Sequence, residues 1–144
     1  MNNPPKIEFY SEDIDFQIDK PEYIQNWIEK CVQENSFSIE HINYIFCSDP
    51  YLLDINQKYL NHDYFTDIIT FDNSEPESED LEGDLYISID RVRDNALQLD
   101  QPFERELHRV MIHGVLHLMG FQDKTPEQES EMRDQEDKCL NLQP

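Results

Sequence analysis

Residues 104–129, ERELHRVMIHGVLHLMGFQDKTPEQE, contain the pattern that decides how this chain folds and what it binds. His113 and His117 lie four residues apart, so a helix would bring them to one face on successive turns. Gly120 is predicted to end that helix, because glycine readily adopts the left-handed conformation of a C-terminal turn. A helix with one buried face is predicted by apolar residues at helical spacing: Leu107, Val110, Met111, Val115 and Leu118.

The residues after Gly120 predict a metal site. The chain can fold back there and bring Asp123 toward His113 and His117. Imidazole and carboxylate groups bind zinc, and three protein ligands leave a fourth position for water or substrate, as in catalytic zinc sites. The alternative is two ordinary histidines on a polar face. The combination of spacing, glycine and placed carboxylate favours one zinc ion held by His113, His117 and Asp123.

The neighbours of the two histidines are informative as well. Zinc peptidases with the motif HExxH use its glutamate as general base. Position 114 is glycine here, which cannot move a proton, so this route to peptide hydrolysis is disfavoured. Gly114 could instead let another backbone or the substrate approach the metal closely. Glu106 and Arg109 fall on the histidine face and could orient ligands or contact substrate, or form only a solvated or salt-bridged pair.

Length and charge limit the possible functions. The chain has 144 residues, which suits one domain over 1–144, and a formal net charge of −21. A high negative charge keeps a protein in solution and could also shape an interface. It argues against a surface that binds nucleic-acid phosphates over a wide area, because phosphate binding depends on lysine and arginine. Three widely spaced cysteines without a CxxC pair predict free thiols and a reducing compartment. No signal peptide or membrane span is visible, which predicts a cytoplasmic protein with no membrane partner.

The rest of the chain predicts alternating strands and helices. Residues 7–18 read as extended, and Pro21 opens a helix whose apolar face includes Trp27 and Ile28. Residues 42–48 read as a strand, and Asp49 as the N-cap of a helix that runs to about Leu60.

The second half of the chain continues this alternation. Residues 66–71, TDIITF, read as a buried strand. Residues 74–84, SEPESEDLEGD, are acidic and polar and read as a mobile loop. A cation site is the alternative, but the segment lacks the regular pattern of a calcium loop. Residues 83–89 read as a strand, and Asp90 as the cap of the next helix. The alternation indicates a mixed layer of strands and helices rather than a bundle.

Four segments resemble the YbeY family of endoribonucleases, the rRNA maturation factors. HGVLHLMGFQD at 113–123 is similar to the family signature HGxLHLxGYDH. NQKYLNHDYFTDIITF at 56–71 is similar to a family segment N-x-x-Y-R-x-x-D-x-x-T-D-V-L-S-F. GDLYISIDRVRDNA at 83–96 and FERELHRVMIHG at 103–114 resemble the family's G-D-I-x-I-S segment and the approach to its metal helix. The similarity runs from about Ile42 to Cys139 in the same order.

This resemblance implies an α+β fold in which a small mixed sheet packs with helices around a central metal-binding helix that ends at a glycine. It also implies zinc, a single-strand-specific endoribonuclease activity, and a role in maturing the 3′ end of small-subunit ribosomal RNA and in ribosome biogenesis. The implied partner is ribosomal RNA, and ribosomal proteins or an assembly GTPase could bind as well. DNA is not an expected partner. Thr70 stands where the family has serine and keeps the hydroxyl. Thr70 is therefore one candidate catalytic residue, and Arg109 on the histidine face is the other.

Two positions depart from the family pattern. The third family ligand is histidine, and Asp123 stands there. Leu60 stands at the position where the family has an arginine in its catalytic cleft. A leucine side chain cannot donate the two hydrogen bonds with which arginine binds phosphate. Lys58, His62 or Arg109 could compensate for it.

Two other functions stay open. The first is a ribosome-assembly factor with a mainly structural metal, which the loss of the cleft arginine favours. The second is a metal-dependent hydrolase of another substrate such as a peptide, which Gly114 disfavours. The sequence leaves the native metal, the general base and the oligomeric state open.

Overall fold

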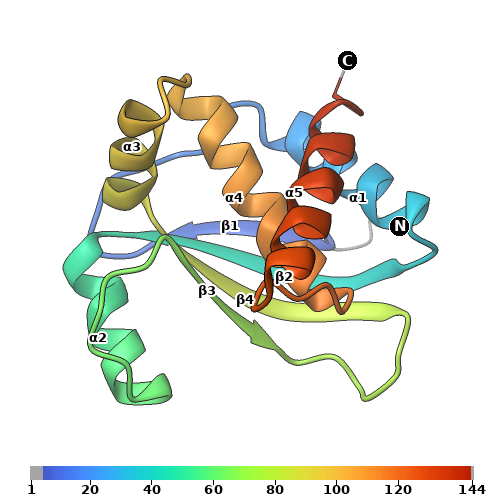
Figure 1. Cartoon of the computed structure of the whole chain (residues 1–144), viewed down its shortest axis with the longest axis horizontal. Coiled ribbons are helices and arrows are strands. Elements are labelled where there is room, and N and C mark those ends of the chain that lie inside the picture. The colour runs from blue at the N-terminus through green and yellow to red at the C-terminus, as the bar shows by residue number, and fades with distance from the viewer. Residues whose placement is uncertain (1–4, 144) are drawn as a thin grey trace.

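Four strands form one mixed sheet at the centre of the described chain (Figure 1). The computed structural model describes residues 5–143, so residues 1–4 and 144 of the predicted domain lie outside the described part. The strands lie in the order β1-β2-β4-β3, with β1 and β4 parallel to β2 and β3 antiparallel to β4. The predicted α+β class with a small mixed sheet is confirmed. The strand bounds are β1 (Ile7–Ser11), β2 (Ser38–Cys47), β3 (Ile68–Asp72) and β4 (Asp80–Ser88).

The helices cover the sheet unevenly. Helices α1, α4 and α5 lie on one side of the sheet, and α2 lies on the other (Figure 1). Within residues 5–143 no helix has both the length and the apolar character needed to cross a bilayer. The helix bounds are α1 (Pro21–Glu34), α2 (Asp49–Leu60), α3 (Ile89–Gln98), α4 (Phe103–Leu118) and α5 (Pro126–Leu140).

Helix α4 lies against the main core, as its apolar face predicts. All five residues of that predicted stripe are buried. On the sheet side, Tyr44 of β2 is fully buried and its hydroxyl donates a hydrogen bond of 2.9 Å to the backbone oxygen of Met111. The face predicted for α1 is buried in the same core at Trp27 and Ile28. The three cysteines are free, as expected, and all three are buried: Cys31, Cys47 and Cys139.

Gly114 lets helix α4 approach the sheet closely. A Cβ atom at position 114 would lie 2.3 Å from Leu85 Cδ2 and 2.7 Å from Ile68 Cδ1, which is inside van der Waals contact. Leu85 is fully buried in β4, so its side chain has little room to withdraw. The sequence interpretation, in which this glycine admits substrate or backbone to the metal, is corrected: position 114 faces the sheet, and its role is packing.

Two predicted helix caps are wrong by one or two residues. Ser48 and Ser88, not Asp49 and Asp90, are the N-caps of α2 and α3. Each serine hydroxyl accepts a hydrogen bond from the backbone amide three residues later, at 3.2 and 3.1 Å. The two aspartates lie in the first turns, where a negative charge is favourable near the helix N-terminus. Asp90 also accepts a hydrogen bond of 2.9 Å from the Asp49 amide.

Strand boundaries differ from the sequence expectations because pairing partners lie far away in the chain. Only Ile7–Ser11 of the extended segment 7–18 is a strand. The predicted loop 74–84 gives way to β4 at Asp80, because parallel pairing with β2 begins there. Strand β3 starts at Ile68 and is an edge strand in which only Ile69 is buried, so the expectation of a buried strand is wrong.

Candidate metal centre

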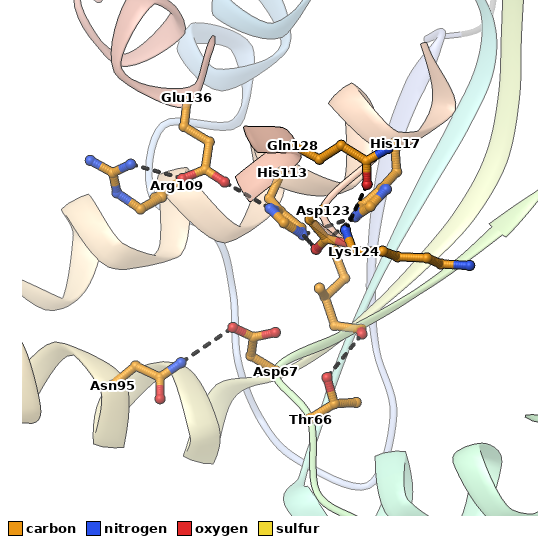
Figure 2. A network of polar contacts seen from close by, with 11 residues as sticks. Thr66, Asp67, Asn95, Arg109, His113, His117, Asp123, Lys124, Gln128 and Glu136 are labelled. Carbon is orange, nitrogen blue, oxygen red and sulfur yellow. Dashed lines mark hydrogen bonds and ion pairs between the residues drawn. The ribbon is translucent and has the colours of Figure 1, made fainter. Parts of the chain in front are cut away.

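Helix α4 and the turn after it bring the three predicted ligands together (Figure 2). His113 and His117 project from successive turns of α4. Gly120 follows with φ of +104°, and its amide donates a hydrogen bond of 3.0 Å to the His117 backbone oxygen. This left-handed residue ends the helix as predicted and turns the chain, so that Asp123 returns to the histidine pair.

The three side chains have the spacing of a tetrahedral metal site. The His113 and His117 Nε2 atoms are 3.0 Å apart, and each lies 3.3 Å from Asp123 Oδ2. A tetrahedron with metal–ligand bonds of about 2.0 Å has ligand–ligand edges of about 3.3 Å. All three residues are partly exposed, so a cation could reach them. The donor atoms therefore fit one small cation with almost no rearrangement.

Glu136 of helix α5 fixes the orientation of His113 (Figure 2). Its Oε2 atom lies 2.7 Å from His113 Nδ1. A carboxylate only accepts hydrogen bonds, so Nδ1 carries the proton and Nε2 presents its lone pair to the other two ligands. Histidines that bind metals usually donate their second N–H to such a partner. Arg109 holds Glu136 in turn through a bond of 2.8 Å, and also bonds Asp137 at 2.7 Å.

Charges in this network shift two pKa values in opposite directions. Burial opposes a charge on His113, but the hydrogen bond and charge of Glu136, with the charges of Asp67 and Asp123, outweigh it and raise the pKa of His113. Burial also opposes the Glu136 carboxylate, but His113 and Arg109 outweigh it and lower the pKa of Glu136. Glu136 therefore stays charged although its side chain is only 7% exposed.

A cavity of about 590 Å³ opens beside the ligands. Thr70 lines it together with His113, His117 and Asp123, so this candidate catalytic residue faces the same space as the metal ligands. Arg109, the other candidate, is not among the described lining residues, because its guanidinium is engaged by α5.

The position of the missing arginine also faces this cavity. Leu60 lines the cavity and is 42% exposed. His62, one of the residues that could compensate for the missing arginine, lines the cavity. Lys58 instead pairs with Asp54 on the surface at 3.0 Å.

Asp67 links this cavity to helix α3 (Figure 2). Its carboxylate accepts a hydrogen bond of 3.2 Å from Asn95 Nδ2, and its backbone oxygen accepts one of 2.9 Å from the Ser88 amide. Burial raises the pKa of Asp67, and the charge of His113 opposes that rise. These two contacts brace the segment that precedes β3. Glu106 of α4 is buried, and burial raises its pKa.

Glu136 was not identified from the sequence, although a signal for it exists. On α5 the buried residues are Met132, Glu136, Cys139 and Leu140, so a glutamate stands within the stripe of the helix that faces the core. Charged residues are almost never buried without a partner. A carboxylate in an apolar stripe, close in sequence to a predicted metal site, therefore indicates a residue that holds a ligand.

Replacing Glu136 with glutamine is expected to weaken the binding of a divalent metal ion about 10- to 100-fold, the usual cost of losing a partner that orients a metal ligand. The amide loses the charge that stabilises His113 Nδ1–H and Arg109. Competition with a chromophoric chelator measures the affinity. Asp137→Asn is the matched control, because Asp137 also bonds Arg109 but lies half exposed. Equal affinity of Glu136→Gln and the unmodified protein would contradict this role.

Comparison with known proteins finds close relatives along almost the whole chain. Residues 6–143 match the family model described as Endoribonuclease YbeY. A protein of that name from Cytophaga hutchinsonii is 48% identical over 136 residues, which cover 94% of each chain. Another from Flavobacterium psychrophilum is 50% identical over 133 residues, covering 92% of this chain and 94% of that protein. A solution structure from Thermotoga maritima is similar with a TM-score of 0.65 at 27% identity, covering 94% of this chain and 87% of that one.

Proposed function

This chain belongs to the endoribonuclease YbeY family, and from this premise we propose that it is a zinc-dependent endoribonuclease specific for single-stranded RNA. One observation carries the proposal: three metal-ligand atoms at tetrahedral spacing line an open cavity of about 590 Å³. We propose ribosomal RNA as the substrate, with maturation of the small-subunit 3′ end in the cytoplasm as the role.

The donor set supports zinc as the metal. Two imidazole nitrogens and one carboxylate oxygen are ligands that zinc accepts in catalytic sites, and three protein ligands leave one position open. A divalent ion there would supply Lewis-acid activation of a phosphoryl oxygen or of water. His113, His117 and Asp123 would hold it, and Glu136 would keep His113 in the required tautomer.

The protein's own groups have separate tasks in this proposal. Thr70 offers a hydroxyl to the substrate from the cavity wall. Arg109 acts as a positioning residue through Glu136, since its guanidinium contacts α5. Position 114 faces the sheet, so the HExxH route to peptide hydrolysis has no base in this chain. A peptidase function is thus the weakest of the alternatives.

Two observations favour a second candidate function. Leu60 lines the cavity where the family pattern has arginine, and the net charge of −21 opposes tight binding of RNA by phosphate contacts. Both features suit an assembly factor that a ribosomal protein or an assembly GTPase brings to the pre-ribosome, with a mainly structural metal. In that case a folded His117→Ala variant would still support rRNA maturation in cells.

Cleavage of a fluorescent single-stranded RNA tests the enzymatic proposal. We expect the purified protein to cut the strand at least about tenfold faster than the same sequence in a duplex. We expect a chelator to stop cleavage and added zinc to restore it, because the metal supplies several kcal/mol of transition-state stabilisation. Cleavage that a chelator leaves unchanged, or none with either the free RNA or pre-ribosomal particles, would contradict the proposal.

A further inference from the structure

Two aromatic side chains form a stacked pair on the wall of the metal-side cavity. The rings of His62 and Tyr64 lie 5.1 Å apart between centroids, at an interplanar angle of 21°. The Tyr64 hydroxyl and His62 Nδ1 are 2.9 Å apart, within hydrogen-bond distance. Both residues line the cavity that contains Thr70 and the three metal ligands. A flat π surface thus borders the space where the proposed substrate would lie.

We propose that the His62–Tyr64 pair is a stacking platform for an unpaired base of the RNA substrate. This inference rests on the proposed function and adds a binding role for two residues that the metal chemistry does not use. Every nucleobase has a π face, so an aromatic platform binds single strands with little dependence on sequence. In a duplex the faces of the bases are covered by their neighbours, so the platform also favours single strands over duplex.

The platform is held in place before any ligand binds. Asn56 is 1% exposed, and its side-chain amide donates a hydrogen bond of 2.9 Å to the Tyr64 backbone oxygen. Its backbone oxygen accepts a hydrogen bond of 3.1 Å from the His62 amide. Asp63 lies between His62 and Tyr64, and its Oδ1 atom accepts a hydrogen bond of 2.6 Å from Gln57 Nε2 of α2. One buried residue of α2 therefore anchors both ends of the segment, which lowers the entropy cost of binding.

Tyr64 also has surface available for a partner. The residue is 56% exposed although His62 stacks on its ring. The neighbouring exposed aromatic residues already have partners: Phe65 lies 5.2 Å from the Arg91 guanidinium, and Tyr59 packs edge-on against Phe71. Tyr64 is thus an exposed aromatic residue that lines the cavity and belongs to a stacked pair.

The charge of the cavity favours base contacts over phosphate contacts. Apart from the metal ligands, the described residues that line the cavity carry two carboxylates, Asp67 and Asp72, and one cation, Lys124. Phosphate binding depends on lysine and arginine, so this wall offers little of it. Stacking on an aromatic ring does not need a positive surface. The platform would therefore supply affinity that the acidic protein cannot obtain from the RNA backbone.

Fluorescence anisotropy with two labelled decamers tests the platform on the metal-loaded protein. One probe is single-stranded oligoadenylate, and the other has the same sugar–phosphate backbone with abasic residues. A denaturing gel checks that the probes stay intact. We expect Tyr64→Ala to bind oligoadenylate about tenfold more weakly and the abasic strand unchanged, because only the stacking contribution is lost. Tyr64→Phe keeps the ring and should bind within about twofold of the unmodified protein.

Tyr10→Ala is the matched control. Tyr10 is 47% exposed, but it lies on β1 and lines a different cavity. Oligoadenylate binding that is equal for Tyr64→Ala, Tyr10→Ala and the unmodified protein would overturn the platform and leave the proposed function intact. Equal loss on both probes would also overturn it. If the unmodified protein binds and cleaves no RNA, the proposed function fails, and the platform fails with it.

Discussion

Replacing His117 with alanine is expected to remove the bound metal and to slow RNA cleavage at least about a hundredfold. Two ligands remain in this variant, and an open site needs three protein ligands to hold zinc. His117 is the better test than His113, because the polar contacts of its side chain are to the other two ligands, whereas His113 also holds Glu136 in α5. Metal content per chain and the cleavage rate of a single-stranded RNA are the two measurements.

His108→Asn provides the control for this variant. His108 lies on the same helix, is 9% exposed, and is close to Trp27 and Gln143 instead of the ligands. We expect His108→Asn to keep one metal ion per chain and a cleavage rate within about threefold, although its thermal stability falls, as is usual for a buried substitution. A folded His117→Ala protein that retains a full metal ion and normal cleavage would show that this histidine is not a ligand.

Replacing Gly114 with glutamate is expected to destabilise the fold by about 4 kcal/mol or more, and to produce no peptidase. The change creates the sequence HExxH. However, the first atom of the new side chain already meets Leu85 Cδ2 at 2.3 Å, and the surroundings are apolar. Overpacking and an unpaired buried carboxylate both oppose folding. For a domain of this size the melting temperature should fall by at least about 10 °C.

Thermal unfolding and a casein assay measure the Gly114→Glu outcome. Gly114→Ala should cost less, about 1–3 kcal/mol, because it adds only the clash and no charge. Gly120→Ala is a useful comparison: nothing lies within 4 Å of a Cβ there, so only the strain of φ +104° remains. A Gly114→Glu protein that melts within about 2 °C of the unmodified one, or that cleaves casein, would show that position 114 faces the metal instead.

The meeting of His113, His117 and Asp123 was predictable because its determinants are local. The spacing of His113 and His117, the helix end at Gly120 and the position of Asp123 all lie within eleven residues. Helical periodicity and the conformation of glycine are enough to place these side chains near one another. The structure places them at ligand distances, as the sequence predicts.

Other features depend on contacts between distant segments, and the sequence did not reveal them. Glu136 reaches His113 only because α5 packs on α4. The start of β4 at Asp80 depends on parallel pairing with β2, some forty residues earlier. The role of Gly114 became clear only from the nearness of Leu85. In each case a local pattern permits several roles, and tertiary packing selects one of them.

Metal analysis of the native protein, combined with anomalous diffraction at the zinc edge, tests the central claim most directly. The protein is purified without a chelating column. We expect one zinc ion per chain, bonded at about 2.0–2.2 Å to Nε2 of His113, Nε2 of His117 and a carboxylate oxygen of Asp123. A protein that holds less than about a tenth of an ion after incubation with zinc, or that binds the ion away from these three side chains, would contradict the account.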